Sequence, residues 1–165
     1  MVNIDSDMSF MRAALDKAAL AYRNCEVPVG AVVVYNNEII AESYNSVIEL
    51  NDPTAHAEMQ VLRIAGRKIG NYRLLDAELF VTLEPCLMCY SAMVHARIRR
   101  VIYGAADKKT GYYSTGSFDL ISSIYNHKIE RVSGILEAES SDLLKKFFKE
   151  RRDAGVAERG GLENR

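Results

Sequence analysis

Apolar residues recur every three or four positions in three segments, which predicts three amphipathic helices. The first helix contains Met8, Met11, Leu15, Ala18, Ala19 and Tyr22. The second segment, "AHAEMQVLRIAGRK", is expected to end near Gly70, because glycine readily adopts the left-handed conformation at helix ends. The third, "AESSDLLKKFFKERR", is expected to turn inward the side chains of Leu143, Leu144, Phe147 and Phe148.

Apolar and β-branched runs between these helices predict strands. "VPVGAVVVY" and "EIIAESY", separated by "NN", predict a β-hairpin whose first strand is apolar on both faces and therefore central. "AELFVTL", "PCLMCYSAMVHARI" and "RRVIYGA" predict a right-handed parallel βαβ unit, and "HKIERVSGIL" supplies a fifth strand. The expected fold is a three-layer α/β/α domain with a mixed five-stranded sheet and catalytic groups at strand-to-helix junctions.

The composition is that of an ordinary soluble globule, with 48% hydrophobic and 26% charged residues in a chain of 165. We assign residues 1–152 to one domain and residues 153–165, which have little to bury, to a flexible C-terminal tail. The formal net charge of -1 means that a nucleic-acid partner would have to use a local basic patch. Without a signal-like start or a bilayer-length apolar run, we expect a cytoplasmic protein with no membrane contact.

The segment "TLEPCLMCYSAM" raises the question of a metal, because Cys86 and Cys89 form a C-x-x-C pair. His56, in "TAHAE", begins the second predicted helix, and the two cysteines begin the helix of the βαβ unit, so two helix N-termini can converge on one ion. The positive ends of the helix dipoles there favour thiolates. Two thiolates and one imidazole suit Zn²⁺ and leave its fourth position to a water molecule, whose pKa the metal lowers to about 7.

Other interpretations of these residues stay open. Glu58, two residues after His56, can carry protons of that water, although an isolated glutamate in a first helical turn more often stabilises the helix dipole. A thioredoxin-like redox pair would need no H-x-E partner. His95 is expected at the surface or in packing, and His127 as a structural hydrogen-bonding residue. Cys25 is most simply a free thiol, but as a fourth ligand it would close the site and make it structural.

"HAE" followed by "PCLMC" matches the H-x-E and P-C-x-x-C pattern of zinc-dependent nucleobase deaminases. With "EVPVGAVVV", "NDPTAHAEMQVLR", "NYRLLDAELFVTLEPC", "ADKKTG" and "FFKERR", the chain from about residue 8 to 152 resembles the bacterial tRNA-specific adenosine deaminases of the TadA type, within the cytidine/deoxycytidylate deaminase superfamily. The resemblance implies a homodimer with one zinc ion per subunit that converts adenosine to inosine at the wobble position of a tRNA anticodon loop.

Two alternatives stand beside that function. A deaminase of a free base or nucleoside, such as guanine, cytosine or cytidine, would use the same fold and the same zinc chemistry. A non-catalytic RNA-binding or structural zinc domain would instead close its site with Cys25 or His127.

The resemblance also implies roles for individual residues. The zinc ligands would be His56, Cys86 and Cys89, and the proton shuttle would be Glu58. The residues that would bind the substrate are Val29, Asn45 and Ala57 at the flipped base, and Asp107, Lys109, Phe148 and Arg151 at the neighbouring nucleotides.

Two tyrosines depart from the family pattern. The family follows "KTG" with small residues, roughly "GAAGS", whereas this chain reads "KTGYYSTGS" and places Tyr112 and Tyr113 there. Their rings could stack on splayed bases or pack on the partner subunit, and we favour packing. Local basic clusters at 96–100, 107–109 and 145–152 offer a patch for RNA, although charges on a terminal helix are usually only solvated.

Overall fold

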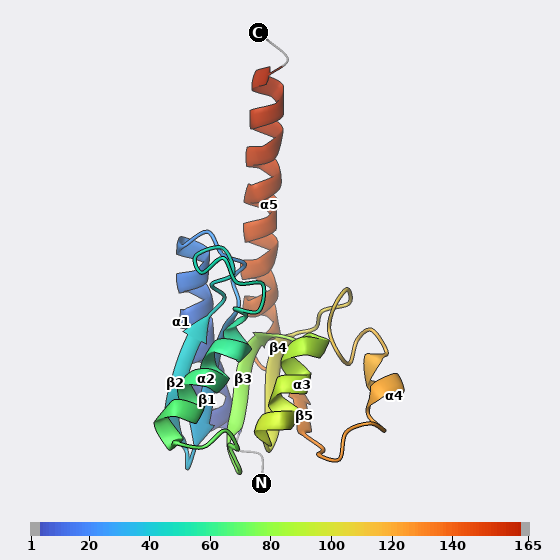
Figure 1. Cartoon of the computed structure of the whole chain (residues 1–165). Helices are drawn as coiled ribbons and strands as arrows, with labels where there is room; N and C mark the ends of the chain where they lie inside the picture. The colour runs from blue at the N-terminus through green and yellow to red at the C-terminus, as the bar shows by residue number, and fades with distance from the viewer. Residues whose placement is uncertain (1–3, 163–165) are drawn as a thin grey trace.

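The computed structural model describes the backbone of residues 4–162 and the side chains of residues 5–154. Figure 1 shows a twisted sheet with helices on both faces. The elements are α1 (Ile4–Arg23), β1 (Gly30–Tyr35), β2 (Glu38–Tyr44), α2 (Ala57–Ile69), β3 (Glu78–Leu83), α3 (Leu87–Ala96), β4 (Arg100–Ala105), α4 (Ser117–Ile121), β5 (Glu130–Ser133) and α5 (Glu137–Leu162). The helices, the hairpin and the βαβ unit predicted from the sequence are all present.

The five strands form one mixed sheet in the order β2-β1-β3-β4-β5. Strand β1 pairs antiparallel with β2 and β3, whereas β3, β4 and β5 are parallel. The hairpin turn uses Asn36 and Asn37 at φ 51° and 63°, the left-handed conformation that two-residue hairpin loops require and asparagine tolerates. Strand β1 is flanked on both sides, which confirms its predicted central place.

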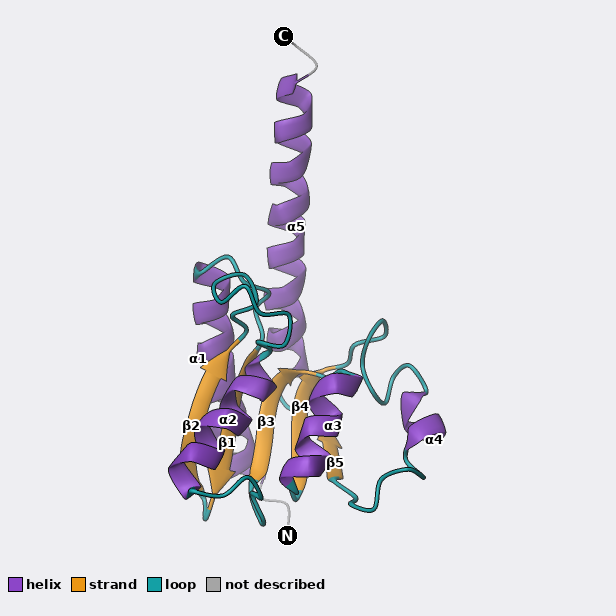
Figure 2. Ribbon diagram, in the orientation of Figure 1, coloured by secondary structure: helices purple, strands orange, loops and turns teal. Residues whose placement is uncertain are grey.

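The sheet separates two hydrophobic cores, because successive side chains of a strand point to opposite faces. One core contains Met11, Ala14, Val32, Val34, Phe80 and Ile102. The other contains alternate residues of the same strands, Ala31, Val33, Leu79, Val81 and Val101, together with residues of α2 and α3. Helices α1 and α5 therefore cover one face, and α2 and α3 lie side by side on the other (Figure 2). This arrangement confirms the predicted three layers.

Helix α1 lies unusually close to strand β1. A Cβ atom at Gly30 would stand 2.1 Å from the carbonyl oxygen of Ala14 and 2.4 Å from the backbone nitrogen of Ala18, so only glycine fits there. The helix also begins earlier than the apolar pattern predicted. Met8, expected to face inward, is 42% exposed, whereas its neighbour Asp7 is buried.

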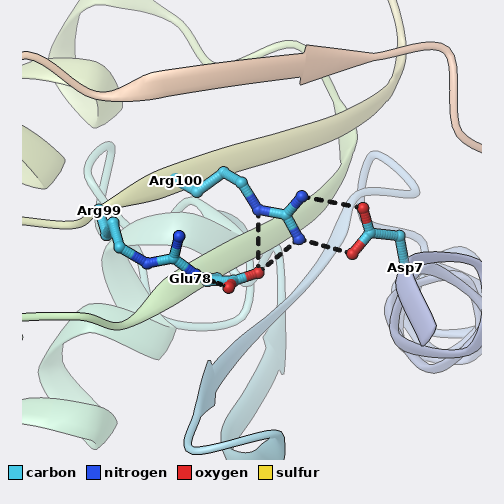
Figure 3. A network of polar contacts seen from close by, with 4 residues as sticks. All are labelled: Asp7, Glu78, Arg99 and Arg100. Atoms are coloured by element: carbon cyan, nitrogen blue, oxygen red, sulfur yellow. Dashed lines mark hydrogen bonds and ion pairs between the residues drawn. The ribbon is translucent and has the colours of Figure 1, made fainter. Parts of the chain in front are cut away.

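Asp7 is buried because it pairs with Arg100 of β4 (Figure 3). The guanidinium donates from Nη1 to Oδ2 at 3.0 Å and from Nη2 to Oδ1 at 2.6 Å, and it also donates from Nε to Oε2 of Glu78 at 3.0 Å. Arg99 pairs with the same glutamate. Arg100 is thus buried in ion pairs where β3 and β4 begin and is not available to the basic patch suggested for RNA, whereas Arg99 stays 48% exposed there.

Helix α5 is longer than expected and projects beyond the sheet (Figure 1). Phe147 is buried, but Phe148 is 45% exposed, so the inward orientation predicted for Phe148 is wrong. Consecutive helical residues point about 100° apart, and the Phe148 side chain lies outside the stripe of α5 that faces the core. The helix continues past Arg152 to Leu162, and residues 163–165 lie outside the described part, so the domain end at 152 and the flexible tail stay predictions. No helix in residues 4–162 has the length and apolar character needed to cross a membrane.

Candidate active site

Helices α2 and α3 begin at the same edge of the sheet, and each begins with a predicted metal ligand. His56 is the N-cap residue of α2 and Cys86 that of α3, and neither side chain caps its own helix by a hydrogen bond. Both residues are extended, with ψ 152° and 170°, so the chain enters each helix with the ligand side chain available. Cys89 follows in the first turn of α3 and is fully buried.

The three ligand atoms have the spacing of a metal site. The Nδ1 atom of His56 lies 3.8 Å from Sγ of Cys86 and 3.5 Å from Sγ of Cys89, and the three atoms all lie within 4.8 Å of one another. Tetrahedral zinc with one nitrogen and two sulfur ligands separates these atoms by about 3.5–3.8 Å. The donor set and its spacing therefore fit zinc, and the structure brings together the three residues that the sequence predicted.

The remaining histidines and the third cysteine lie apart from this group. Cys25 is an exposed free thiol, and His95 is exposed on α3. The Nε2 atom of His127 bonds the carbonyl oxygen of Ile98 at 2.7 Å, the structural role expected for it. Within the described residues, no other cluster of three or more metal-binding side chains is formed. A closed site completed by Cys25 or His127 is not present, and a three-ligand site has room for water.

The two thiols have unequal acidity. The hydrogen bond with Cys89, together with the nearby His56, holds the pKa of Cys86 at about 4. The same hydrogen bond, with burial, raises the pKa of Cys89. Because thiolates are the ligands, a bound divalent cation favours loss of the thiol protons.

Glu58 lies in the first turn of α2 and is only 4% exposed. Burial raises the pKa of its carboxyl to about 7, although its own backbone N–H and the charge of His56 act in the opposite direction. A carboxyl group that titrates near neutrality can both accept and release a proton at physiological pH. This environment suits a proton carrier better than a solvated acid that serves only the helix dipole.

Three residues expected at the base pocket are linked by hydrogen bonds beside His56. The backbone N–H of Asn45 donates to the carbonyl oxygen of Val29 at 3.0 Å. The backbone N–H of Ala57 donates to Oδ1 of Asn45 at 2.8 Å. All three residues are buried. The oxygen of the Asn45 amide is engaged by the protein, which leaves its Nδ2 group to meet a ligand.

Asp107 and Lys109 lie in the turn that follows β4. The carboxylate of Asp107 accepts the backbone N–H groups of Lys109 at 2.9 Å and Thr110 at 3.2 Å, and also the Thr110 hydroxyl. Burial opposes ionisation of Asp107, but these hydrogen bonds outweigh it and lower the pKa. The side chain of Lys109 is exposed. Asp107 therefore shapes the turn that presents Lys109.

Phe148 and Arg151 lie on α5. The Arg151 guanidinium donates to the carbonyl oxygen of Cys25 in the turn before β1, and its centre lies 5.2 Å from the centroid of the Phe147 ring. Phe148 projects outward beside it. The exposed aromatic ring and the anchored guanidinium lie on one helix that packs beside α1.

Tyr112 is not placed to stack on a splayed base or to pack on a partner subunit, the two roles considered for it from the sequence. Its side chain is fully buried and its ring stacks on that of Tyr90 of α3, with centroids 3.8 Å apart and planes at 15°. Tyr113 is half-buried, with the Arg131 guanidinium 4.6 Å above its ring. Tyr112 packs within its own subunit, because the loop folds back over α3, so neither base stacking nor partner contact describes it.

Two buried glutamates near the site escaped the sequence analysis. Glu26 accepts the backbone N–H groups of Ile48 and Glu49, both at 2.8 Å, and thereby holds the loop that leads to His56. Glu84 is likewise buried and accepts backbone N–H groups of the loop after β4. In the sequence, Glu84 is a charged residue that ends an apolar strand and comes just before a metal ligand, which was the available signal.

Comparison with known proteins adds to this geometry. The sequence profile of the cytidine and deoxycytidylate deaminase zinc-binding region matches residues 4–105. The tRNA-specific adenosine deaminase of Haemophilus influenzae is 43% identical over 164 residues, which cover 99% of this chain and 95% of that protein. That of Buchnera aphidicola subsp. Baizongia pistaciae is 45% identical over 148 residues, 90% of this chain and 91% of that protein.

Among solved structures, one from studies of A-to-I editing by tRNA:A34 deaminases at the wobble position of transfer RNA superposes with a TM-score of 0.80. It is 46% identical and the match covers 82% of this chain and 99% of that one. Sequence and backbone therefore agree over nearly the whole of the relatives' length.

Proposed function

The chain belongs to the cytidine and deoxycytidylate deaminase family, and on that premise we propose that it hydrolyses adenosine to inosine at the wobble position of a tRNA anticodon loop. The observation that carries the proposal is the group of His56, Cys86 and Cys89 with the buried Glu58 beside it. Among the possible deaminase substrates, adenosine in tRNA is favoured by the relatives. These are named tRNA-specific adenosine deaminases and are 43–45% identical over 90% or more of both chains.

The proposed reaction exchanges an amino group for oxygen at C6 of adenine. Zinc held by His56, Cys86 and Cys89 supplies Lewis-acid activation of the attacking water at neutral pH. Glu58 accepts a proton from that water and delivers it to N1 of the base. As the water oxygen bonds to C6, the carboxyl would take the remaining proton from that new C6 hydroxyl and give it to the amino group, so that the C6–N bond breaks, ammonia leaves and the carbonyl of inosine forms. Because burial holds the pKa of Glu58 near 7, the carboxyl can act in both directions.

The remaining predicted residues supply binding in this proposal. A wobble nucleotide is unpaired, so splaying it into a pocket costs less than extracting a paired base, which costs a few kcal/mol. Asn45 offers its Nδ2 group to the nucleotide, and Val29 and Ala57 line the pocket for the base. The residues proposed to contact neighbouring nucleotides are Asp107, Lys109, Phe148 and Arg151.

We propose further that the protein acts in the cytoplasm as a homodimer with one zinc ion per subunit. The surface between α2 and α3 supports the dimer, since its lining includes the apolar residues Met59, Leu62 and Ala92 and the 69% exposed Tyr72, beside the charged residues Arg63 and Arg67. Apolar surface of this kind is suited to a protein partner.

The proposal is tested by incubating the purified protein with an anticodon stem-loop RNA that carries adenosine at the wobble position, followed by nucleoside mass analysis. Free adenosine, guanine and cytidine are incubated in parallel, and a second stem-loop carries the adenosine at an adjacent loop position. Inosine only in the wobble RNA supports the proposal. Conversion only of a free base or nucleoside would place the protein in the alternative class, with the same zinc chemistry.

A further inference from the structure

The carboxylate of Glu84 gathers hydrogen bonds from both ends of one loop. Its Oε2 atom accepts the backbone N–H of Asp107 at 2.9 Å. Its Oε1 atom accepts the backbone N–H groups of Tyr113 at 2.8 Å and Ser114 at 2.7 Å, and the Ser114 hydroxyl donates to Oε2. The side chain is 2% exposed, so water does not compete for these bonds. One buried group thus closes the loop 107–114.

The same loop is pressed against the segment that carries a metal ligand. The backbone N–H of Tyr112 donates to the carbonyl oxygen of Pro85 at 2.9 Å, and Gly111 forms an isolated β-bridge with Cys86. A Cβ atom at Gly111 would lie 2.4 Å from the carboxyl carbon of Glu84, so a larger residue would displace the loop. The loop and the ligand segment therefore form one packed unit.

We propose that Glu84 is a positioning residue for the RNA substrate, which it serves by fixing the loop that carries Asp107 and Lys109 beside Cys86. This inference rests on the proposed function and adds to it a residue that fixes the shape of an RNA-binding loop. Glu84 is buried beneath the loop and acts through the loop's backbone. The loop would have to hold its shape before RNA arrives, because a floppy loop loses conformational entropy on binding.

A carboxylate is the side chain that satisfies this loop. It has two acceptor oxygens and no donor, and it faces three backbone N–H groups and a hydroxyl. In Glu84→Gln, one oxygen becomes an NH₂ group that points at N–H donors. The substitution keeps the shape of the side chain but leaves one or two backbone N–H groups of the loop unpaired.

The test compares the double variant Glu58→Ala/Glu84→Gln with the single variant Glu58→Ala. Because Glu58→Ala prevents turnover, RNA binding alone is measured. The affinity for the wobble-adenosine stem-loop is measured by fluorescence anisotropy, amide hydrogen exchange is followed at Tyr113 and Ser114, and zinc is determined by metal analysis. We expect about tenfold weaker RNA binding, as losing charged hydrogen bonds implies, with faster exchange and retained zinc. Glu78→Gln, at the start of β3 and so at the end of the strand away from Glu84, is the matched control and should change neither affinity nor loop exchange.

Gly111→Ala provides a second variant, since its Cβ would clash with the Glu84 carboxyl group and the Asp107 carbonyl oxygen and so displace the loop without changing the charge of Glu84, and it should weaken RNA binding in the same way. Unchanged affinity in a Glu84→Gln protein whose loop exchanges faster would overturn the inference, as would unchanged exchange. Loss of zinc would also overturn it, because Glu84 would then act on Cys86 and not through the loop. If the wild-type protein makes no inosine in the stem-loop RNA, the proposed function fails, whereas the exchange result still reports whether Glu84 holds the loop.

Discussion

The side-chain oxygen of Asn45 accepts a 2.8 Å hydrogen bond from the backbone N–H of Ala57, the first residue of helix α2. Asn45 is itself tied through its backbone to Val29. One amide group therefore fixes the start of the helix beside His56 and also lies at the edge of the pocket proposed for the base. The Oδ1 atom of the amide holds the helix start, and its Nδ2 group is proposed to bind the nucleotide. Substitutions of Asn45 can separate these two roles.

Asn45→Ala removes the acceptor and leaves a buried backbone N–H unpaired, so we expect the free energy of unfolding to fall by about 1–3 kcal/mol. Asn45→Asp keeps an acceptor oxygen at the positive end of α2 and should regain most of that stability. It lacks the donor offered to the nucleotide, so inosine formation should stay low. Urea denaturation and inosine assays of both variants test this. Full activity of Asn45→Asp would contradict the donor role.

The ion pair of Asp7 with Arg100 should matter for stability and not for catalysis. Asp7→Ala leaves a buried guanidinium that keeps Glu78 as a charged partner, so the loss should be smaller than the roughly 3–5 kcal/mol of a buried charge left without any partner. The matched control is Arg12→Ala on the same helix, whose exposed pair with Glu139 contributes less than about 1 kcal/mol. Urea denaturation of both proteins should show the larger loss for Asp7→Ala. Equal losses would contradict the account.

Arg151→Ala should weaken binding of the anticodon stem-loop and leave zinc content unchanged. Removing one phosphate contact lowers the slope of log affinity against log salt by about 0.7 for a single strand. Arg12→Ala is the control, because Arg12 lies outside the basic clusters suggested for RNA and pairs with Glu139 at 3.2 Å. A salt titration by fluorescence anisotropy measures both. Unaltered binding by Arg151→Ala would count against an RNA contact on α5.

Removal of the metal should abolish activity reversibly. Dialysis against a chelator is expected to stop inosine formation, and added Zn²⁺ should restore it, since the three ligands hold the ion that activates water. Cys89→Ser should reduce zinc below one ion per subunit, whereas Cys25→Ser, at the exposed free thiol, should keep both zinc and activity. Zinc content, measured by metal analysis, and inosine formation are determined for each variant to test this prediction. Full activity in the chelated protein would contradict the zinc site.

The features that the sequence predicted well have local causes. The hairpin follows from two asparagines between β-branched runs, and the end of α2 follows from Gly70, which is left-handed at φ 72°. The metal ligands could be placed because His56 and Cys86 stand at helix starts, where the pattern of apolar residues changes period. Spacing along the chain was enough for the hairpin and the helix end, whereas the choice of His56, Cys86 and Cys89 as ligands also used the resemblance to zinc-dependent deaminases.

The features that the sequence missed depend on partners far away in the chain. Asp7 is buried and Met8 exposed, contrary to the apolar pattern, because Arg100 lies 93 residues further on and pairs with Asp7. Tyr112 is buried because it stacks on Tyr90, which no local signal announces. Glu84 looked like the polar end of a strand until the loop that it binds was in place.

The most direct measurement of the central claim follows zinc content and inosine formation together in Glu58→Ala, with Cys86→Ala as its counterpart. If Glu58 carries protons in a catalytic zinc site, Glu58→Ala keeps about one zinc ion per subunit and a folded structure but forms no inosine in the stem-loop RNA, whereas Cys86→Ala loses zinc as well. Inosine formation at the wild-type rate by Glu58→Ala, or loss of zinc and fold together in that variant, would contradict the account.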